Sequence, residues 1–265
     1  MSSIKDRIRR SFSRAAPTYD DAVIIQRGIA AQMAKHLENE RFSKILELGC
    51  GTGNYTELLL KSNPDAHITA IDFSEEMVQT AKAKLRKFGS RISFAVKDIE
   101  DLHIEEYGAG FDLITSNSTF HWLSDFQVSV SKCAGMLSKG GKFLISYFGP
   151  ETYKELKQVL EDYFGRRIQL SADSFLGKTD FVNIMRRRFH PLSIAEYETV
   201  HNYDTFLALL LTIKNSGTAG AGTGLVFNKT ALREIEAAFI KRFGSICATY
   251  HYYIFSGINK GYAKQ

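Results

Sequence analysis

The sequence predicts a doubly wound α/β fold, in which a mostly parallel sheet is covered by helices on both faces. Short apolar runs typical of buried strands alternate with amphipathic helical segments over the first 150 residues, and the first such run leads directly into a glycine-rich turn. Strands that are separated by helices form right-handed βαβ units and therefore a parallel sheet. With 265 residues, of which 44% are hydrophobic, the chain suffices for one large domain that carries an inserted cap.

The N-terminal part is expected to start with a short basic helix. Ile4, Ile8 and Phe12 recur at helical spacing and give this helix one apolar stripe, and Pro17 ends it. A second helix follows over 22–37, and another opens at Asn54. The remaining elements expected before residue 150 are strands over 44–48, 68–71, 92–96, 111–115 and 142–148, and helices over 74–88 and 126–137.

The C-terminal part departs from this regular alternation. Its expected elements are helices over 151–164, 181–188, 204–215 and 229–243, and strands over 193–203 and 247–256. The glycine-rich stretch 217–224 is interpreted as a loop, because no Gly-Lys-Ser/Thr ending makes it a phosphate loop. We therefore expect a single domain over 1–265, divided into an N-terminal helical lid (1–40), a core (41–150), a cap-containing part (151–245) and a last strand (246–257). Residues 164–224 are expected to form part of a cap over the strand ends.

Charge and cysteine usage exclude several classes of protein. The net charge is +5 and the pI about 9.0, without a Lys/Arg block of the kind that binds nucleic acid. The N-terminus lacks the apolar stretch of a secretory signal, and the most apolar run, 207–213, is too short to span a bilayer. Cys50, Cys133 and Cys247 lie far apart, which argues against a disulfide framework or a metal site. We expect a cytoplasmic protein with no metal, membrane or nucleic-acid partner.

The strongest motif is Glu47-Leu48-Gly49-Cys50-Gly51-Thr52-Gly53, at the carboxyl end of the first strand. Glycines there let the backbone turn tightly and approach a ligand. A nicotinamide fingerprint needs its third glycine at position 54, where Asn54 stands. Glycines at 49, 51 and 53 follow the spacing of enzymes that bind S-adenosylmethionine (SAM), and the Glu47 carboxylate suits the ammonium group of that cofactor. A glycine triplet alone is also compatible with a purely structural turn.

Two further carboxylates follow on the next strand ends. Asp72 ends the second strand, where an acidic side chain accepts hydrogen bonds from both ribose hydroxyls of a nucleoside. Asp98 follows the third strand and is placed to accept from the adenine amino group, with Ile99 covering the ring. Each has a structural alternative, because Asp72 can open a turn and Asp98 can cap the next segment. Their joint placement on successive strand ends predicts a nucleoside cofactor at the carboxyl edge of the sheet.

The order of these signals, with Asn117 after the fourth strand, resembles the class I SAM-dependent methyltransferase family over about residues 40–150. The resemblance implies a seven-stranded, Rossmann-like sheet with a helical cap, and SAM as cofactor with S-adenosylhomocysteine as product. The cofactor-binding residues that it implies are Gln26, Glu47, Gly49, Cys50, Gly51, Asp72, Phe73, Met77, Asp98, Ile99 and Asn117.

A narrower resemblance is carried by short segments along the whole chain: 11–16 (Ser-Phe-Ser-Arg-Ala-Ala) with Tyr19-Asp20, 117–122 (Asn-Ser-Thr-Phe-His-Trp), 213–217 (Ile-Lys-Asn-Ser-Gly) and 249–251 (Thr-Tyr-His). They are similar to the malonyl-[acyl-carrier protein] O-methyltransferases of biotin synthesis. That family implies methyl esterification of the free carboxyl of a malonyl thioester, carried by an acidic acyl carrier protein or by coenzyme A. His121 stands where the family pattern often has Gln, which puts a catalytic role for His121 in doubt.

Roles toward the acceptor follow from this resemblance. Tyr19 is the expected catalytic residue, as a hydroxyl donor that positions the acceptor; the alternative is a lid tyrosine that only packs. The expected substrate-binding residues are His121, Trp122, Tyr250, Arg186 and Arg187. Arg186 to Arg188, with Arg166 and Arg167, are expected to form a basic face for the carrier protein, the alternative being a solvated helix face. Trp122 also suits a pocket wall or the core, and Tyr250 and His251 also suit alternate faces of a strand.

Three other functions stay open. One is a methyltransferase for another small acid, such as aconitate. Another is a methyltransferase for a quinone or polyketide carbon, which needs a base to remove a proton, a role open to His121. The third is a non-catalytic SAM-binding protein. A carboxylate acceptor is already ionised at neutral pH, so esterification requires alignment rather than a strong base.

Overall fold

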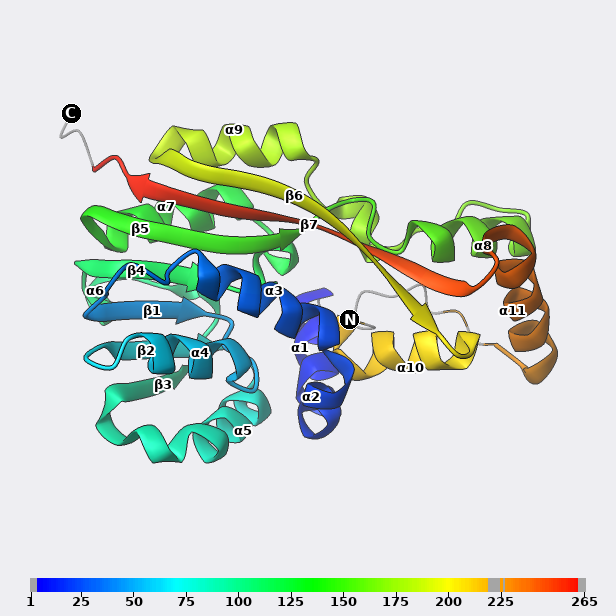
Figure 1. Ribbon diagram of the computed structural model, residues 1–265, viewed down its shortest axis with the longest axis horizontal. Helices are drawn as coiled ribbons and strands as arrows, with labels where there is room; N and C mark the ends of the chain where they lie inside the picture. Colours follow the sequence, from blue (N-terminus) through cyan, green and yellow to red (C-terminus); the bar gives the residue numbers. More distant parts are fainter. Residues whose placement is uncertain (1–3, 219–224, 226, 262–265) are drawn as a thin grey trace. The chain divides into compact units, whose positions relative to one another are not determined.

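The computed structural model describes residues 4–218, 225 and 227–261, and the chain divides into two compact units (Figure 1). Unit 1 consists of Met1–Val23, Phe148–Leu176 and Glu196–Tyr252. Unit 2 consists of Ile24–Tyr147, Gly177–Ala195 and Tyr253–Gln265. Two long strands, β6 and β7, contribute residues to both units. Among the described residues, no helix is both long and apolar enough to cross a membrane.

The helices and strands follow the alternation that the sequence predicts. The strands are β1 (Lys44–Leu48), β2 (His67–Asp72), β3 (Ile92–Val96), β4 (Phe111–Ser116), β5 (Leu137–Phe148), β6 (Phe189–Tyr203) and β7 (Ile246–Asn259). The helices are α1 (Ile4–Ala15), α2 (Tyr19–Ala22), α3 (Ile24–Lys35), α4 (Asn54–Ser62), α5 (Glu75–Leu85), α6 (Ile104–Tyr107), α7 (Phe126–Met136), α8 (Lys154–Phe164), α9 (Lys178–Arg188), α10 (Phe206–Asn215) and α11 (Lys229–Phe243).

Unit 2 is built on a seven-stranded sheet with the order β3-β2-β1-β4-β5-β7-β6. The pairs β1–β2, β1–β4, β2–β3 and β4–β5 are parallel. Strand β7 runs opposite to β5 and β6, which places an antiparallel pair at one edge (Figure 1). The expected mostly parallel, doubly wound α/β fold is confirmed.

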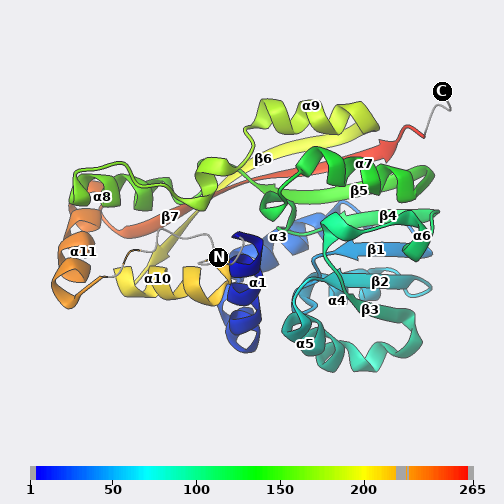
Figure 2. The ribbon, with the colours of Figure 1, turned by 180° about the vertical axis from the view of Figure 1, so that it is seen from behind.

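Helices cover both faces of this sheet. Helix α3 packs on α4 and lies in front of the sheet in Figure 1, whereas α7 lies in front of it when the molecule is turned around in Figure 2. The apolar run of β1 is therefore buried on both sides, and Ile45, Leu46 and Leu48 have no exposed surface. A continuous apolar strand is what burial on both faces requires.

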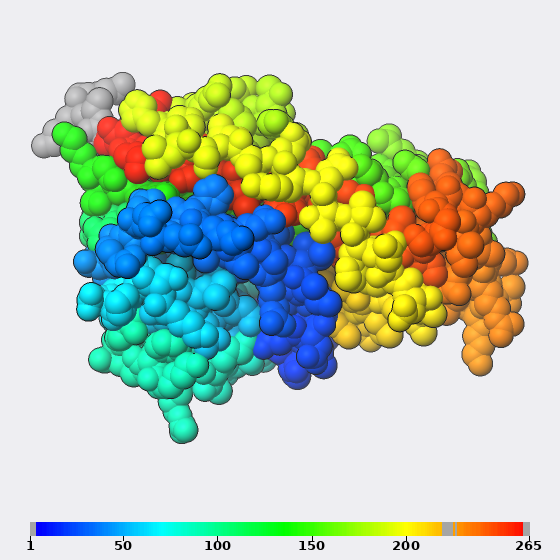
Figure 3. Space-filling view, viewed as in Figure 1, coloured from blue at the N-terminus to red at the C-terminus, as the bar shows by residue number. Residues whose placement is uncertain are grey.

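In unit 1 the N-terminal helix α1 packs on α10, and α8 packs on α11. The space-filling view shows α1 and α2, in dark blue, against the yellow surface of α10 (Figure 3). Ile8 is buried and Phe12 half-buried, but Ile4 is 61% exposed. The expected stripe of Ile4, Ile8 and Phe12 is therefore wrong at Ile4, which lies one turn before the part of the helix that packs.

Several boundaries differ from those expected. The helix over 74–88 ends at Leu85 and continues as the 3₁₀ stretch Arg86–Arg91, which Gly89 interrupts with a non-helical backbone (φ 59°, ψ −133°). The helix expected from residue 151 starts at Lys154, after Tyr153 (φ 63°). Most of the loop expected over 217–224 lies outside the described residues.

Candidate functional site

The predicted cofactor residues of unit 2 come together at the carboxyl edge of four neighbouring strands. Leu48 of β1 pairs with Ile71 of β2, and Asp72 pairs with Val96 of β3. Asp98 and Asn117 follow directly after β3 and β4. Parallel strands end at the same edge of a sheet, where open α/β sheets bind their ligands.

The glycine turn after β1 is fixed to the end of β2. The amides of Gly49 and Cys50 both donate to the Ile71 carbonyl, at 2.8 and 2.9 Å. The glycines at 49, 51 and 53 have φ of 74°, 54° and 86°, a region that other residues rarely adopt. A Cβ on Gly49 would lie 2.3 Å from the Thr119 hydroxyl oxygen, so a side chain at this position would displace Thr119.

Asp72 clamps this turn as well as ending β2. Its Oδ2 accepts from the Gly51 amide and its Oδ1 from the Ser74 amide, each at 2.9 Å. Burial raises the pKa of Asp72 to about 6, and the backbone amides limit the rise. Each carboxylate oxygen has two lone pairs, so these bonds leave acceptor capacity for ribose hydroxyls. The structural and cofactor roles of Asp72 are thus compatible.

The surroundings of Glu47 show whether this site fits a cationic ligand. Its side chain is 1% exposed, and Oε2 has no hydrogen-bond partner among the described residues. Burial raises the pKa of Glu47 to about 8; nearby Asp72 adds to the rise, and the Thr56 hydroxyl offsets part of it. A buried acceptor without a partner is costly. An ammonium group such as that of SAM would satisfy it, so the residues present fit the cofactor.

Asp98 and Ile99 lie at the next strand end. Asp98 Oδ1 accepts from the Glu100 amide at 2.9 Å and so caps the short 3₁₀ helix Ile99–Asp101. The structural alternative for Asp98, a cap on the next segment, is therefore present in the structure. Ile99 is 7% exposed. Adenine binding by this pair stays a prediction.

Asn117 ties three segments together. Its Nδ2 donates to the Gln26 carbonyl of α3 at 3.0 Å, and its Oδ1 accepts from Ser146 Oγ of β5 at 2.8 Å. Ser146 Oγ in turn accepts from the Ser118 amide at 2.8 Å, which holds Ser118 in a left-handed conformation (φ 56°). The sequence does not predict these roles of Ser118 and Ser146. The one available signal is a polar residue, Ser146, near the end of the apolar strand β5.

Three other predicted cofactor residues lie nearby in the chain. Met77 is 1% exposed in the first turn of α5, and its amide donates to Ser74 Oγ at 3.3 Å. Cys50 is buried, which raises the pKa of its thiol well above the usual range. Phe73 is half-buried. Their contacts with a cofactor stay predictions.

His121 and Trp122 belong to the 3₁₀ turn Phe120–Trp122 after β4. His121 is 8% exposed, and burial lowers its pKa to about 3. Its ring lies 4.8 Å from that of Trp122 and 5.9 Å from that of Tyr147. His121 is therefore a neutral, packed imidazole at physiological pH.

Arg186 and Arg187 are exposed in the last turn of α9. Arg187 donates to Gln127 of α7 at 3.3 Å, and Lys260 donates to the Arg186 carbonyl at 2.6 Å. These arginines belong to unit 2, whereas Arg166 and Arg167 belong to unit 1. Docking of a partner on the α9 arginines stays a prediction.

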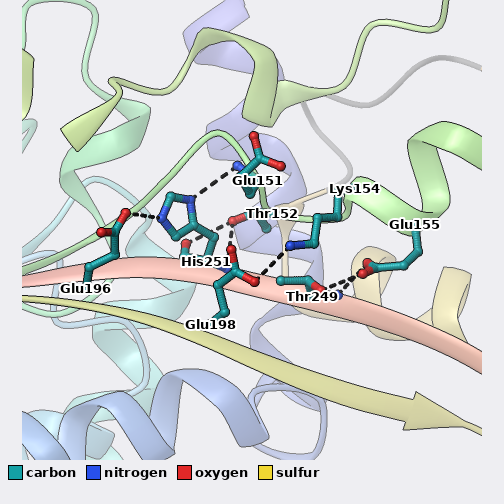
Figure 4. A network of polar contacts seen from close by, with 8 residues as sticks. All are labelled: Glu151, Thr152, Lys154, Glu155, Glu196, Glu198, Thr249 and His251. Carbon is teal, nitrogen blue, oxygen red and sulfur yellow. Dashed lines mark hydrogen bonds and ion pairs between the residues drawn. The ribbon is translucent and has the colours of Figure 1, made fainter. Parts of the chain in front are cut away.

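Tyr19 and Tyr250 are the predicted site residues of unit 1. Tyr19 is the first residue of α2, with its ring 6.3 Å from that of Phe12. Tyr250 is 3% exposed, and its hydroxyl lies 2.6 Å from that of Tyr203. His251 contacts Glu196 instead (Figure 4). The role of Tyr250 toward the acceptor stays a prediction.

Comparisons with known proteins identify the family of the chain. Residues 39–188 match the family model described as methyltransferase domain. The chain is 33% identical over 262 residues to a malonyl-[acyl-carrier protein] O-methyltransferase of Bacillus cytotoxicus, covering 93% of this chain and 89% of that protein. It is 30% identical to malonyl-[acyl-carrier protein] O-methyltransferase 2 of Ilyobacter polytropus, covering 91% and 92%.

Solved structures show the same fold at low identity. The YcgJ protein of Bacillus subtilis superposes with a TM-score of 0.61 at 17% identity, covering 88% of this chain and 98% of that one. The N-methyltransferase NodS of Bradyrhizobium japonicum, solved with S-adenosylhomocysteine, gives a TM-score of 0.56 at 15% identity, covering 97% and 100%. These structures show the fold alone, whereas the family model and the relatives at 30–33% identity show that the chain belongs to the malonyl-[acyl-carrier protein] O-methyltransferase family of methyltransferases.

Proposed function

We propose that the protein is a SAM-dependent carboxyl O-methyltransferase that esterifies the free carboxyl of a malonyl thioester. The names of its relatives, malonyl-[acyl-carrier protein] O-methyltransferases, support this acceptor. The observation that carries the cofactor assignment is the row of carboxylates at Glu47, Asp72 and Asp98 on three adjacent strand ends. Relatives that match over nearly their whole length support the acceptor.

The residues that would hold the cofactor have distinct tasks. Glu47 would pair with the ammonium group, because its Oε2 is buried and has no partner among the described residues. Asp72 would accept the ribose hydroxyls, and Asp98 with Ile99 would bind the adenine. The glycine turn allows the ligand to approach the backbone closely.

When bound, SAM supplies an electrophilic methyl group on a sulfonium. The acceptor carboxylate is the nucleophile and is ionised at neutral pH. The residues of this chain then have to align the carboxylate and exclude water. Alignment of this kind is worth about 7–11 kcal/mol.

His121 discriminates between this reaction and methylation of a carbon. Removing a proton from carbon requires a base whose pKa lies near the working pH. With a pKa of about 3, His121 is too weakly basic for that role. His121 therefore does not serve as that base, which supports an acceptor that is already an anion. Another small acid, such as an aconitate-like compound, is the second candidate because it presents the same carboxylate.

For the acceptor we propose Tyr19 as a positioning donor and His121, Trp122 and Tyr250 as binding residues. Arg186 and Arg187 would attract the acidic carrier protein. We also propose a cytoplasmic location.

Methyl transfer from labelled SAM to a panel of acceptors tests this function. The panel contains malonyl carrier protein, malonyl-coenzyme A, free dicarboxylic acids and quinones. We expect base-labile label on the malonyl thioester and none on the quinones. Label only on a free acid would support the second candidate, and no transfer to any acceptor would support a SAM-binding protein without catalysis.

The raised pKa of Glu47 predicts how cofactor affinity depends on pH. The carboxyl must be ionised to pair with the ammonium group, and its pKa of about 8 keeps it largely protonated below that pH. Between about pH 6.5 and 7.5, the affinity for SAM should rise with pH by a factor that approaches tenfold per unit. Calorimetry with SAM measures this slope. The same pKa shift affects the stability of the protein without cofactor. Because the folded state holds the proton of Glu47 more tightly than the unfolded state, the contribution of Glu47 to stability falls as pH rises from 4.5 toward 8.

Two controls isolate Glu47. Glu47→Gln should bind SAM weakly at every pH and lose the slope. The analogue 5′-methylthioadenosine has no ammonium group, so its affinity should not follow the slope in the unmodified protein. An equal slope for both ligands would contradict the pairing.

Reversing charge on α9 tests carrier-protein docking. The double variant Arg186→Glu/Arg187→Glu should lower kcat/KM for malonyl carrier protein by about tenfold at low salt, because steering by opposite charge is lost. Steady-state kinetics should show the loss shrinking toward about 1 M salt. Lys82→Glu/Arg86→Glu, at exposed positions in the last turn of α5 and directly after it, is the matched control. An equal loss in both double variants would mean that net charge, not docking on α9, is responsible.

A further inference from the structure

In unit 1, the polar side chains of β6 and β7 form two rows, one on each face of the strand pair. Successive residues of a strand point to opposite faces, so neighbours in sequence take part in different rows. One row consists of Glu196, Glu198, Thr249 and His251, and the other of Tyr197, Tyr203, Tyr250 and Tyr252. His251 Nε2 lies 3.0 Å from Glu196 in the first row, and the rings of Tyr197 and Tyr252 stack at 5.1 Å in the second.

The first row clamps the segment that joins β5 to α8 (Figure 4). Gly149 and Tyr153 donate their amides to the carbonyls of His251 and Thr249, each at 2.8 Å. The Glu151 amide donates to His251 Nδ1 at 3.3 Å. Because Nδ1 accepts, Nε2 carries the proton and donates to Glu196. The segment is therefore bound to β7 along its length.

Glu155 completes this clamp at the start of α8. The Thr249 amide donates to its Oε2 at 2.8 Å and the Thr249 hydroxyl to its Oε1 at 2.6 Å. The carboxylate is 8% exposed, and both of its oxygens are thus satisfied. The carboxylates of Glu155 and Glu196 therefore contact Thr249 and His251 of β7, and Glu198 pairs with Lys154.

The clamped segment holds Tyr153 in a left-handed conformation (φ 63°, ψ 28°). Non-glycine residues rarely adopt it, and such strain persists where surrounding contacts impose it, most often at binding sites. The conformation places the Tyr153 ring 5.2 Å from that of Tyr250, at an angle of 68°. Tyr153 thereby joins the row of tyrosines on the opposite face of β7.

Three tyrosine hydroxyls meet there. Those of Tyr203 and Tyr250 lie 2.6 Å apart, and that of Tyr153 also bonds to Tyr250. Thr212 and Thr218 contact the two ends of this chain of hydroxyls. Burial raises the pKa of all three tyrosines, so each hydroxyl stays protonated. The two contacts within the chain engage two of the three protons, which leaves the third for a partner outside the three tyrosines. Tyr250 is buried, but Tyr153 and Tyr203 are half-buried and reach solvent.

We propose that the hydroxyls of Tyr153, Tyr203 and Tyr250 form an anion-binding site that takes the free carboxylate of the acceptor. The inference rests on the proposed function and adds Tyr153 and Tyr203 to it as binding residues. Neutral donors suit a carboxylate that must react as a nucleophile, because they orient it without placing a full positive charge against it. Thr249 and His251 act as positioning residues through the clamp.

Binding of malonyl and acetyl carrier protein to the complex with S-adenosylhomocysteine tests the site without turnover. The two ligands differ by one carboxylate, so calorimetry should show tighter binding of the malonyl form. Tyr153→Phe, Tyr203→Phe and Tyr250→Phe should each weaken binding of the malonyl form by about tenfold or more, the usual effect of losing a hydrogen bond to a charged group. Binding of the acetyl form and of S-adenosylhomocysteine should not change.

Tyr252→Phe is the matched control, since it removes one hydroxyl from a buried tyrosine of the same strand. It should leave the preference for the malonyl form intact. Equal weakening of both ligands in the three variants, or no preference in the unmodified protein, would overturn the inference. A protein that prefers the malonyl form but fails to methylate it would overturn the proposed function and leave the anion site standing.

Discussion

A protein that lacks residues 1–20 is expected to bind SAM normally and to transfer methyl groups at least about 10²-fold more slowly, the size of effect that misplaced reactants produce. The strand-end residues predicted to bind the cofactor belong to unit 2, and the deleted residues belong to unit 1. Calorimetry and single-turnover transfer to malonyl carrier protein separate the two effects. The truncated protein should still melt cooperatively, because the sheet and its covering helices are retained.

Two point variants narrow this prediction. Tyr19→Phe removes one hydroxyl and should lower turnover more than it lowers cofactor affinity. Gly217→Ala acts on the packing of α1, since a Cβ there would lie 2.4 Å from the Phe12 ring and Gly217 has φ of 75°. Gly217→Ala should therefore also lower turnover, although this variant keeps the Tyr19 hydroxyl. Full transfer by the truncated protein would show that the N-terminal segment has no part in the reaction.

The cofactor edge could be predicted from the sequence because topology alone assembles it. Glu47, Asp72 and Asp98 each lie at or just beyond a strand end, and parallel pairing brings those ends together whatever the details of packing. The same reasoning could not show that Asp72 already accepts two amides, from Gly51 and Ser74, because that depends on the path of two turns.

The tyrosine cluster could not be predicted in the same way. Tyr153, Tyr203 and Tyr250 are separated by about fifty residues each, and no local pattern links them. Their contact depends on the left-handed backbone of Tyr153, which long-range bonds from β7 impose against its intrinsic preference. Of the three, the sequence points only to Tyr250, through its resemblance to a family.

Of the predicted cofactor residues, Asp72 is expected to cause the largest loss of SAM affinity when it is replaced. Asp72→Ala should weaken SAM binding by at least about tenfold, because two ribose hydroxyls lose a charged acceptor and such bonds are worth roughly 1.5–3 kcal/mol. The amides of Gly51 and Ser74 lose their acceptor too, so the glycine turn should loosen and the melting temperature should fall. The change in affinity therefore has to be separated from the change in stability.

Asp112 offers that separation. Its Oδ2 accepts the amides of Ser43 and Lys44, each at 3.0 Å, so Asp112→Ala also removes a carboxylate that holds two backbone amides. Asp112 lies near the amino end of β4, however, away from the carboxyl ends that carry the cofactor residues. Asp112→Ala should lower the melting temperature and leave SAM affinity unchanged, whereas Asp72→Ala should lower both. If calorimetry on folded Asp72→Ala gave the affinity of the unmodified protein, Asp72 would be only a clamp on the glycine turn, and the ribose would have to be bound elsewhere.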